Sequence, residues 1–415
     1  MFEYDAAVLL EWITFAIRWL HVITAVAWIG SSFYFIALDL GLRQRAGLPE
    51  GAYGEEWQVH GGGFYHVQKY LVAPQNMPDH LTWFKWESYA TWLSGFTLLC
   101  LVYYVGADLY LVDPNVMALS NWEGIGLSLA SIGVGWVVYN ILCKSPLGDN
   151  PNLLMGVLVI FLLAMSYGYS EIFTGRAALL HLGAFTATIM SANVFFIIIP
   201  NQKIVVEDLK AGRTPDAKYG KIAKLRSTHN NYLTLPVLFL MLSNHYPLAF
   251  ASEYNWLIAV LVFGMGVSIR HFFNSMHARK GEPYWAWVIT AVIFVLIMWI
   301  STAPMRGQSD GDMSSSATPL SLSPAILARM ESPHFEAVVE TVQGRCSMCH
   351  AQEPGWEGIL WAPKGVKLEE AGDIAKYARE IYLQAGLTHA MPPANVSYME
   401  ESERQLIQTW YKEVR

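Results

Sequence analysis

The chain has 415 residues, of which 53% are hydrophobic and only 15% are charged. Soluble proteins carry about 25% charged residues, so this composition excludes an ordinary soluble globular protein and predicts a membrane protein. The net charge of −7 identifies no class of partner, because the charged residues are unevenly distributed along the chain.

Apolar stretches long enough to span a bilayer as helices dominate the larger part of the chain. The eight stretches lie near residues 12–39, 81–107, 122–143, 152–170, 177–200, 231–250, 254–275 and 284–303. We therefore expect an all-α fold in which residues 1–303 form an eight-helix transmembrane bundle. Ser, Pro, Gly, Thr and Asp then dominate residues 304–332, which predicts a flexible linker before a C-terminal domain, residues 333–415.

The first and fifth predicted helices share a sequence pattern. When His21 is aligned with His181, identical residues also coincide at positions 27 and 187, 29 and 189, 31 and 191, and 35 and 195. Because each half would contain an even number of helices, the two halves would run in the same direction. We expect two parallel four-helix repeats.

The distribution of basic residues predicts the orientation in the membrane. Loops after the first, third, fifth and seventh predicted helices carry many Lys and Arg residues, whereas the opposite loops carry only Arg176. Basic loops face the cytoplasm by the positive-inside rule. The sequence therefore predicts a multi-pass protein of the bacterial inner (plasma) membrane, with the N-terminus and the C-terminal domain on the periplasmic side.

Residues 346–350 read Cys-Ser-Met-Cys-His, the pattern by which haem is attached covalently. Cys346 and Cys349 lie about one helical turn apart and can reach the two vinyl groups of one macrocycle. His350 is the expected first axial ligand of the haem c iron. The alternatives for the cysteine pair are a thiol redox pair and half of a zinc site. A zinc site needs two more Cys or His ligands nearby, and the other cysteines lie far upstream in apolar stretches.

The second axial ligand is expected 41 residues after His350, at Met391, because two prolines follow that methionine and stiffen its loop. Met399 and His389 are weaker alternatives. Residues 333–415 also resemble a small soluble class I cytochrome c, with helices expected over residues 335–342 and 401–413.

Polar and ionisable side chains concentrate at the predicted cytoplasmic ends of the second, sixth and seventh helices. Such residues are costly within a membrane and are candidates for function by default. The alternative for each one is an end residue that reaches the interface, or a hydrogen bond between helices.

Several short patterns carry a family resemblance. They are residues 19–21 with 28–30, 61–65, 83–87 with 91–96, and 229–232 with 235–237. With these patterns the chain resembles, over essentially its full length, the integral-membrane urate oxidases (urate hydroxylases) that carry a C-terminal cytochrome c. The resemblance implies oxidation of urate to 5-hydroxyisourate without hydrogen peroxide, with electrons passing through the cytochrome c domain. The implied partners are urate, the lipid bilayer and a downstream respiratory oxidase or soluble cytochrome. Binding of nucleic acid is not expected.

With urate as the substrate, we expect binding at the cytoplasmic ends of the second, sixth and seventh helices. Arg270 is the expected clamp for the urate anion, because a guanidinium group suits a flat anion. The other expected substrate-binding residues supply polar donors or an aromatic face: Lys85, Asn230, Asn231, Trp83 and Phe272. Glu87, His229 or His271 is expected to accept a proton from urate or from the attacking water.

A cytoplasmic urate site would be separated from a periplasmic haem by about 30 Å of hydrocarbon. An electron relay is therefore expected, and we hypothesise a non-covalent haem b bound by His21 together with His181 or His245. The alternative is that these are hydrogen-bonded buried histidines. Two rival functions also stay open, namely a quinol-oxidising respiratory electron-transfer protein and a transporter with an accessory cytochrome.

Overall fold

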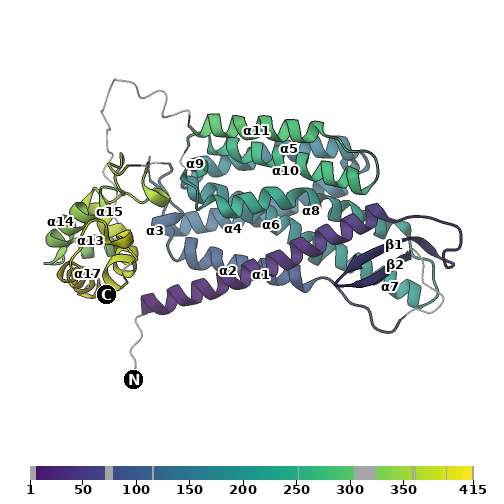
Figure 1. Cartoon of the computed structure of the whole chain (residues 1–415), viewed down its shortest axis with the longest axis horizontal. Helices are drawn as coiled ribbons and strands as arrows, with labels where there is room; N and C mark the ends of the chain where they lie inside the picture. Colours follow the sequence, from purple (N-terminus) through teal and green to yellow (C-terminus); the bar gives the residue numbers. More distant parts are fainter. Residues whose placement is uncertain are drawn as a thin grey trace.

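The computed structural model of the chain describes residues 6–70, 78–114, 116–250, 252–302, 324–357, 359, 361–388 and 390–413. It shows an elongated bundle of helices with a smaller C-terminal domain at one end (Figure 1). Most of the described residues are helical.

The bundle is built mainly from long helices. They are α1 (Ala6–Gly41), α2 (Trp86–Leu99), α4 (Asn121–Lys144), α5 (Pro151–Ile172), α6 (Gly175–Ala192), α7 (Ile199–Lys210), α8 (Ala217–Ser243), α10 (Asn255–His277) and α11 (Trp285–Ser301). The π-helical segment η1 (Cys100–Tyr104) continues α2, and η3 (Asn193–Ile198) joins α6 to α7. The short helices α3 (Ala107–Tyr110) and α9 (Pro247–Phe250) lie in the connections.

Five helical segments of the described chain are long and apolar enough to cross a membrane: Ala6–Gly41, Asn121–Lys144, Pro151–Ile172, Gly175–Lys210 and Asn255–His277. The helix α11 is also apolar but has only 17 residues. These helices support a membrane protein, as the composition predicted. The count of eight spans and the division into two repeats stay predictions.

The helix α8 begins earlier than the sequence predicted. We expected it near residue 231, but it starts at Ala217, where Asp216 accepts a hydrogen bond from the Lys218 backbone N–H at 2.9 Å. Its first half is polar, and hydropathy does not detect a polar helix that continues an apolar one. His229 and Asn230 therefore lie in the middle of α8 and not at its opening.

Residues 52–70 form a β-hairpin, which departs from the expected all-α fold. The strand β1 (Ala52–His60) pairs antiparallel with β2 (Gly63–Tyr70). Gly61 and Gly62 connect the strands with φ angles of +58° and +80°. Two successive residues with positive φ are what a tight two-residue hairpin turn requires, so glycine at both positions favours this turn.

The helix α6 lies at the centre of the bundle and contributes many of its buried residues. Phe185 of α6 packs so closely on α4 that a Cβ added to Gly135 would lie 2.0 Å from the Phe185 ring. Likewise, a Cβ at Gly266 of α10 would lie 2.6 Å from Pro236 of α8. Small residues at these crossings let the helices approach closely, as is common in membrane bundles.

The C-terminal domain consists of α13 (Pro324–Met330), α14 (Phe335–Cys346), α15 (Ala371–Lys376), α16 (Ala378–Ile381) and α17 (Glu401–Glu413). Trp410 is fully buried, stacks on Phe335 and donates its indole N–H to the Arg329 carbonyl oxygen at 3.0 Å. The start of this domain differs from the predicted boundary at residue 333. Residues 324–330, which we expected in the linker, form α13, and Ile326 packs in the core of the domain.

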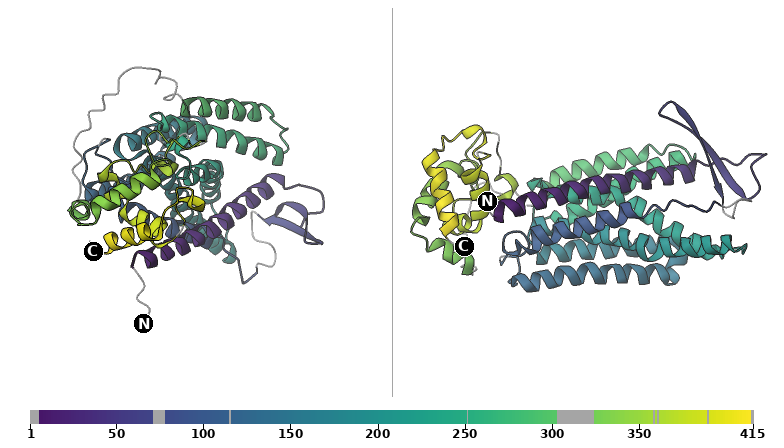
Figure 2. Two further views of the ribbon diagram at one scale, coloured as in Figure 1. Left: turned by 60° about the vertical axis from the view of Figure 1, so that its left-hand side comes forward. Right: turned by 90° about the horizontal axis from the view of Figure 1, so that it is seen from below.

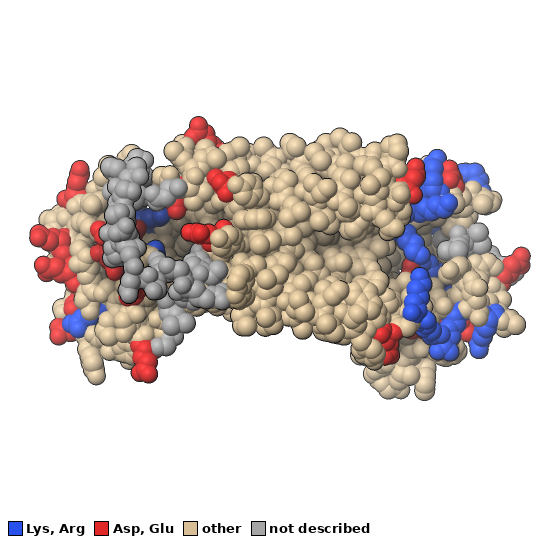
Figure 3. Space-filling view, turned by 90° about the horizontal axis from the view of Figure 1, so that it is seen from above, with Lys and Arg blue, Asp and Glu red and all other residues tan. Residues whose placement is uncertain are grey.

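The start of α1 lies beside the C-terminal domain, whereas the hairpin and α7 lie at the opposite end of the molecule (Figure 1, Figure 2). Glu11 of α1 pairs with Arg379 of α16 at 3.1 Å, and Tyr110 of α3 donates to Glu380 at 3.2 Å. Lys and Arg side chains gather at the end opposite the C-terminal domain (Figure 3). This arrangement agrees with the uneven loop charges from which the orientation was predicted.

Candidate functional site

The Cys-Ser-Met-Cys-His motif lines a cavity of about 600 Å³. The helix α14 ends at Cys346, and Cys349 and His350 follow in the next turn. The Nδ1 atom of His350 lies 2.8 Å from the Val366 carbonyl oxygen. Nδ1 is therefore the protonated nitrogen, and Nε2 keeps its lone pair for a ligand, an arrangement typical of iron-binding histidines.

Met391 lines the same cavity as the motif. Its loop is fixed by two hydrogen bonds, from its backbone N–H to the Gln384 carbonyl at 2.8 Å and from Arg404 to its own carbonyl at 3.0 Å. Met399 is only 4% exposed in the core of the domain and does not line the cavity. His389 lies outside the described residues. The two cysteines, His350 and Met391 thus form a donor set that fits a covalent haem.

The geometry argues against both alternatives for the cysteine pair. Burial raises the pKa of the Cys346 thiol to about 11 and also raises the pKa of Cys349, whereas reactive thiol pairs have lowered pKa values. Within the described part of the chain, no three Cys, His, Asp or Glu side chains form a group that could hold a metal ion on their own.

Replacing Met391 with alanine is expected to remove the methionine–iron absorption band near the red end of the spectrum while the haem stays covalently attached. The matched control is Met399→Ala, which removes a buried side chain and is expected to cost about 2–5 kcal/mol of stability while the band persists. Absorption spectra and thermal unfolding of both variants test this. Loss of the band in Met399→Ala alone would assign the ligand to Met399.

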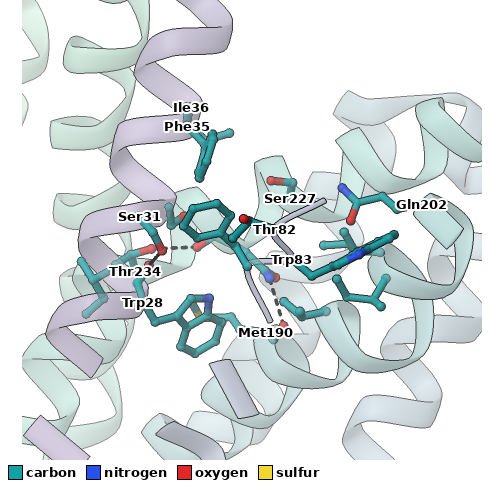
Figure 4. A pocket seen from close by; sticks show the side chains of 17 residues that line it. Trp28, Ser31, Phe35, Ile36, Thr82, Trp83, Met190, Gln202, Ser227 and Thr234 are labelled. Carbon is teal, nitrogen blue, oxygen red and sulfur yellow. Dashed lines mark hydrogen bonds between the residues drawn. The ribbon is translucent and has the colours of Figure 1, made fainter. Parts of the chain in front are cut away.

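A second cavity, of about 290 Å³, lies between helices of the bundle, and Figure 4 shows the side chains that line it. Its walls come from α1, the segment before α2, the continuous helix α6–η3–α7 and α8. Trp28 and Trp83 supply aromatic surface, and Gln202 and Asn230 supply amide groups. Hydroxyl groups come from Ser31, Ser32, Thr82, Ser227 and Thr234. None of the residues found to line it carries a charge.

A buried polar network lies directly behind Asn230. The Asn230 Oδ1 atom accepts a hydrogen bond from Asn193 at 3.1 Å, and its amide donates to the Met190 carbonyl at 2.9 Å. Asn193 in turn accepts from Arg226 at 3.3 Å, and Arg226 also donates to Asn140 at 2.8 Å. Asn193 is 0% exposed and Arg226 is 1% exposed. Two hydrogen bonds therefore connect the cavity to a buried guanidinium group.

Arg226 has no carboxylate partner among the ion pairs of the described residues. Its guanidinium lies 4.9 Å from the centre of the Tyr139 ring, and the Tyr139 hydroxyl contacts His229 Nδ1 at 2.8 Å. A buried cation without a counter-charge is costly, so an anion nearby would be stabilised. From the sequence, Arg226 is expected among the basic residues of the loop after the fifth predicted helix. Arg226 lies four residues before Asn230, and residues four apart share one face of a helix. This spacing is the sequence signal that groups Arg226 with Asn230.

Arg270, the expected anion clamp, does not line this cavity. It is 5% exposed, donates to Asn231 at 3.4 Å and to Asn274 at 3.0 Å, and its guanidinium lies 4.0 Å from the centre of the Phe33 ring. Asn231 is fully buried, and its Nδ2 atom has no hydrogen-bond partner within the described ranges. Trp83 and Asn230 thus line the same cavity. Arg270 and Asn231 contact each other and do not line it.

Phe272, an expected stacking face, is engaged in packing between α10 and α11. Its ring centre lies 5.4 Å from Phe273, 5.7 Å from Tyr284 and 5.5 Å from Trp287. Lys85 precedes α2, with its ammonium 5.9 Å from the centre of the Trp86 ring. Neither Phe272 nor Lys85 lines the cavity.

The three expected proton acceptors have different surroundings. Glu87 lies in the first turn of α2, and one of its carboxylate oxygens is buried without a hydrogen-bond partner among the described residues. His271 lies 5.5 Å from the Trp285 ring on the side of α10 that faces α11. His229 alone connects to the cavity through hydrogen bonds, because its partner Tyr139 also accepts from Asn193 at 3.0 Å.

The histidines of the hypothesised haem b have hydrogen-bond partners or are exposed. The two ring nitrogens of His181 contact the Ala177 carbonyl and the Ser128 hydroxyl, each at 2.8 Å. His21 Nδ1 lies 3.0 Å from the Thr91 carbonyl, and His245 is exposed at the end of α8. This arrangement leaves neither nitrogen of His181 free for iron and matches the alternative of a hydrogen-bonded buried histidine. A membrane haem b stays a prediction.

The two cavities are closer than the separation of about 30 Å expected from the sequence. Both are lined by α1, the first by Arg18 and the second by Trp28. These residues lie ten positions apart, which is about 15 Å along a helix axis. The gap is thus about half of the 30 Å that motivated a relay.

Comparisons with known proteins give one family. A search of curated proteins found no match, and a search of solved structures found none. The family described as Urate oxidase N-terminal matches residues 7–301. This range covers the helical bundle, including the bundle residues that line the two cavities. The chain therefore belongs to the urate oxidase N-terminal family.

Proposed function

We propose that this protein is a membrane-bound urate oxidase that converts urate to 5-hydroxyisourate and passes the electrons through a covalently bound haem c. Urate and one water molecule together lose two electrons and two protons, and the water oxygen bonds to C5 of urate. The haem supplies one-electron transfer to a downstream respiratory oxidase or soluble cytochrome, so no hydrogen peroxide forms.

Family membership indicates a urate-related oxidoreductase. The observation that carries the finer proposal is the presence of two distinct cavities in one chain. One is small, aromatic and amide-lined, and the other combines two cysteines, a histidine and a methionine. A substrate site and an electron-acceptor site in one molecule are what a peroxide-free oxidase requires.

The cavity of about 290 Å³ is our proposed urate site. Urate is flat, with N–H donors and carbonyl acceptors around its edge. Trp28 and Trp83 offer aromatic faces to its rings. Asn230 uses one amide hydrogen on Met190, and the second is available for a urate oxygen.

Arg226 supplies the positive charge for the urate anion in this proposal. It acts as a positioning residue, because Asn193 stands between it and Asn230. Its hydrogen bond to Asn193 orients that amide, which in turn fixes the orientation of the Asn230 amide. Inside a low-dielectric bundle the charge also acts over a longer range than in water.

Among the expected proton acceptors, we assign the role to His229. It shares the Tyr139 hydroxyl with Asn193, and no such connection to the cavity exists for Glu87 or His271 among the described hydrogen bonds. In this role the imidazole donates its Nδ1–H to the Tyr139 oxygen and keeps the lone pair of Nε2 for the incoming proton.

The proposed topology has eight spans, with the basic end in the cytoplasm and the C-terminal domain in the periplasm. The charge separation along the long axis and the position of α1 beside the C-terminal domain support it. Five helices meet the length and composition for spanning.

Urate added to the purified, oxidised full-length protein is expected to reduce its haem without producing hydrogen peroxide. Quinol is expected to leave the haem oxidised. Absorption spectroscopy of the haem together with a peroxide assay measures both results. Reduction by quinol and indifference to urate would identify a quinol-oxidising protein, and indifference to both would favour a transporter.

A further inference from the structure

The haem-motif cavity is shared between the C-terminal domain and the bundle. Besides the motif and Met391, its walls include Thr14, Arg18 and Val102 of α1 and η1, and Arg176 at the start of α6. The cavity of the C-terminal domain is therefore closed by the membrane domain, and groups on the membrane domain face whatever the cavity holds.

Two arginines of the membrane domain, Arg18 and Arg176, lie at this boundary. Neither Arg18 nor Arg176 has a carboxylate partner among the ion pairs of the described residues. The Nε atom of Arg176 is buried and has no hydrogen-bond partner among the residues that the structure describes, and the guanidinium lies 4.8 Å from the centre of the Tyr110 ring. A buried donor without a partner costs about 1–3 kcal/mol, which a bound acceptor would recover.

These arginines are also unusual for their position. Arg18 interrupts the apolar α1, and Arg176 is the only basic residue in the loops expected on that side. An arginine in a spanning helix is costly unless it faces a partner or a polar cavity. The other arginines of the cavity already have partners: Arg345 binds Glu403, Arg379 binds Glu11, and Arg329 donates to the Ala375 carbonyl.

We propose that Arg18 and Arg176 bind the two propionate carboxylates of the haem, so that the membrane domain completes the haem site of the C-terminal domain. This rests on the proposed covalent haem c. The thioether bonds fix one edge of the macrocycle at Cys346 and Cys349, and its only carboxylates lie on the opposite edge. A guanidinium group matches a carboxylate through two parallel hydrogen bonds. Lys364 and Lys376 also line the cavity but belong to the C-terminal domain itself.

Binding of the propionates by the membrane domain has an electrochemical consequence. Positive charge beside the propionates favours the reduced, less positive iron, because it offsets the carboxylate charges that stabilise the oxidised iron. Removing both guanidinium groups is therefore expected to lower the reduction potential of the haem. We expect the ratio of oxidised to reduced haem at a fixed potential to rise about tenfold, which corresponds to about 59 mV for one electron.

The test is spectroelectrochemical titration of the haem in the full-length protein, with Arg18→Gln, Arg176→Gln and the double variant. Arg176→Lys keeps the charge and is expected to recover most of the potential while losing the paired hydrogen bonds. Arg213→Gln is the control, because Arg213 is exposed, pairs with Asp208 and lies at the opposite end of the molecule. It removes the same charge and is expected to leave the potential unchanged.

The Michaelis constant for urate separates this proposal from its rival. We expect it to be unchanged in the double variant, because the proposed urate site lies elsewhere. An unchanged potential with a raised Michaelis constant would overturn the proposal and make these arginines substrate ligands. The proposal would also be overturned if both the reduction potential and the Michaelis constant were unchanged in the double variant. An equal shift of the reduction potential in Arg213→Gln would overturn it as well. Failure of the proposed function looks different, since wild-type protein would then lack covalent haem or would not be reduced by urate.

Discussion

Replacing Arg226 with glutamine is expected to lower kcat/KM for urate by roughly 30- to 150-fold. The variant removes the charge behind the urate site and the donor that orients Asn193 and, through it, Asn230. Losing a buried charge-assisted hydrogen bond costs about 2–3 kcal/mol, and each 1.36 kcal/mol is about tenfold in rate. Steady-state kinetics with urate, alongside the haem spectrum and a thermal melt, measures the effect and excludes general unfolding.

The comparison with Arg270→Gln gives this experiment its control. Arg270 is also a buried arginine without an ion-pair partner in the described part of the chain, but it contacts Asn231 and Asn274 and does not line the cavity. If Arg226 acts as proposed, Arg226→Gln has the larger effect, and Arg226→Lys lies between it and the wild type. A larger rise of KM in Arg270→Gln would restore the clamp that the sequence suggested and contradict our assignment of the site.

The haem motif and most helices were readable from the sequence because their signals are local. The spacing of Cys346 and Cys349 is a fixed pattern within one helical turn, and the apolar stretches coincide with helices of the bundle. The helices expected over residues 335–342 and 401–413 likewise correspond to α14 and α17. Signals of this kind need no knowledge of how distant segments pack.

The proposed urate site was only partly readable, because it is assembled by packing. Trp83 and Asn230 were selected for their type and location, and they do share a cavity. Arg226 and Asn193 were missed, since one lies in a basic stretch that resembles a solvated loop and the other in an apolar run. Burial and hydrogen bonding, which depend on tertiary contacts, turn them into a network.

The hairpin was missed for a different reason. Loop length and a glycine run were visible, but residues 52–70 alternate only weakly between polar and apolar side chains, and several large apolar ones stay exposed. Trp57, Phe64 and Tyr65 are 58%, 77% and 54% exposed. The early start of α8 has a similar origin, since its first turns are polar and are helical because they continue a buried helix.

Replacing both Cys346 and Cys349 with serine is expected to abolish covalent haem attachment and, with it, all urate-dependent reduction of an external cytochrome. Urate binding is expected to survive, because the two cavities have no lining residue in common and share only the helices α1 and α6. Pyridine haemochrome spectra measure the haem. Quenching of tryptophan fluorescence by urate measures binding, since Trp28 and Trp83 line the site.

The matched variant Cys100→Ser removes another cysteine, from η1 within the bundle, and is expected to keep both haem and activity. Urate turnover in the double cysteine variant would mean that electrons leave by another route, such as a haem b in the membrane domain. Loss of urate binding together with the haem would place substrate and haem in one site. Two separate cavities, about 15 Å apart along α1, predict that the double cysteine variant still binds urate but no longer transfers its electrons.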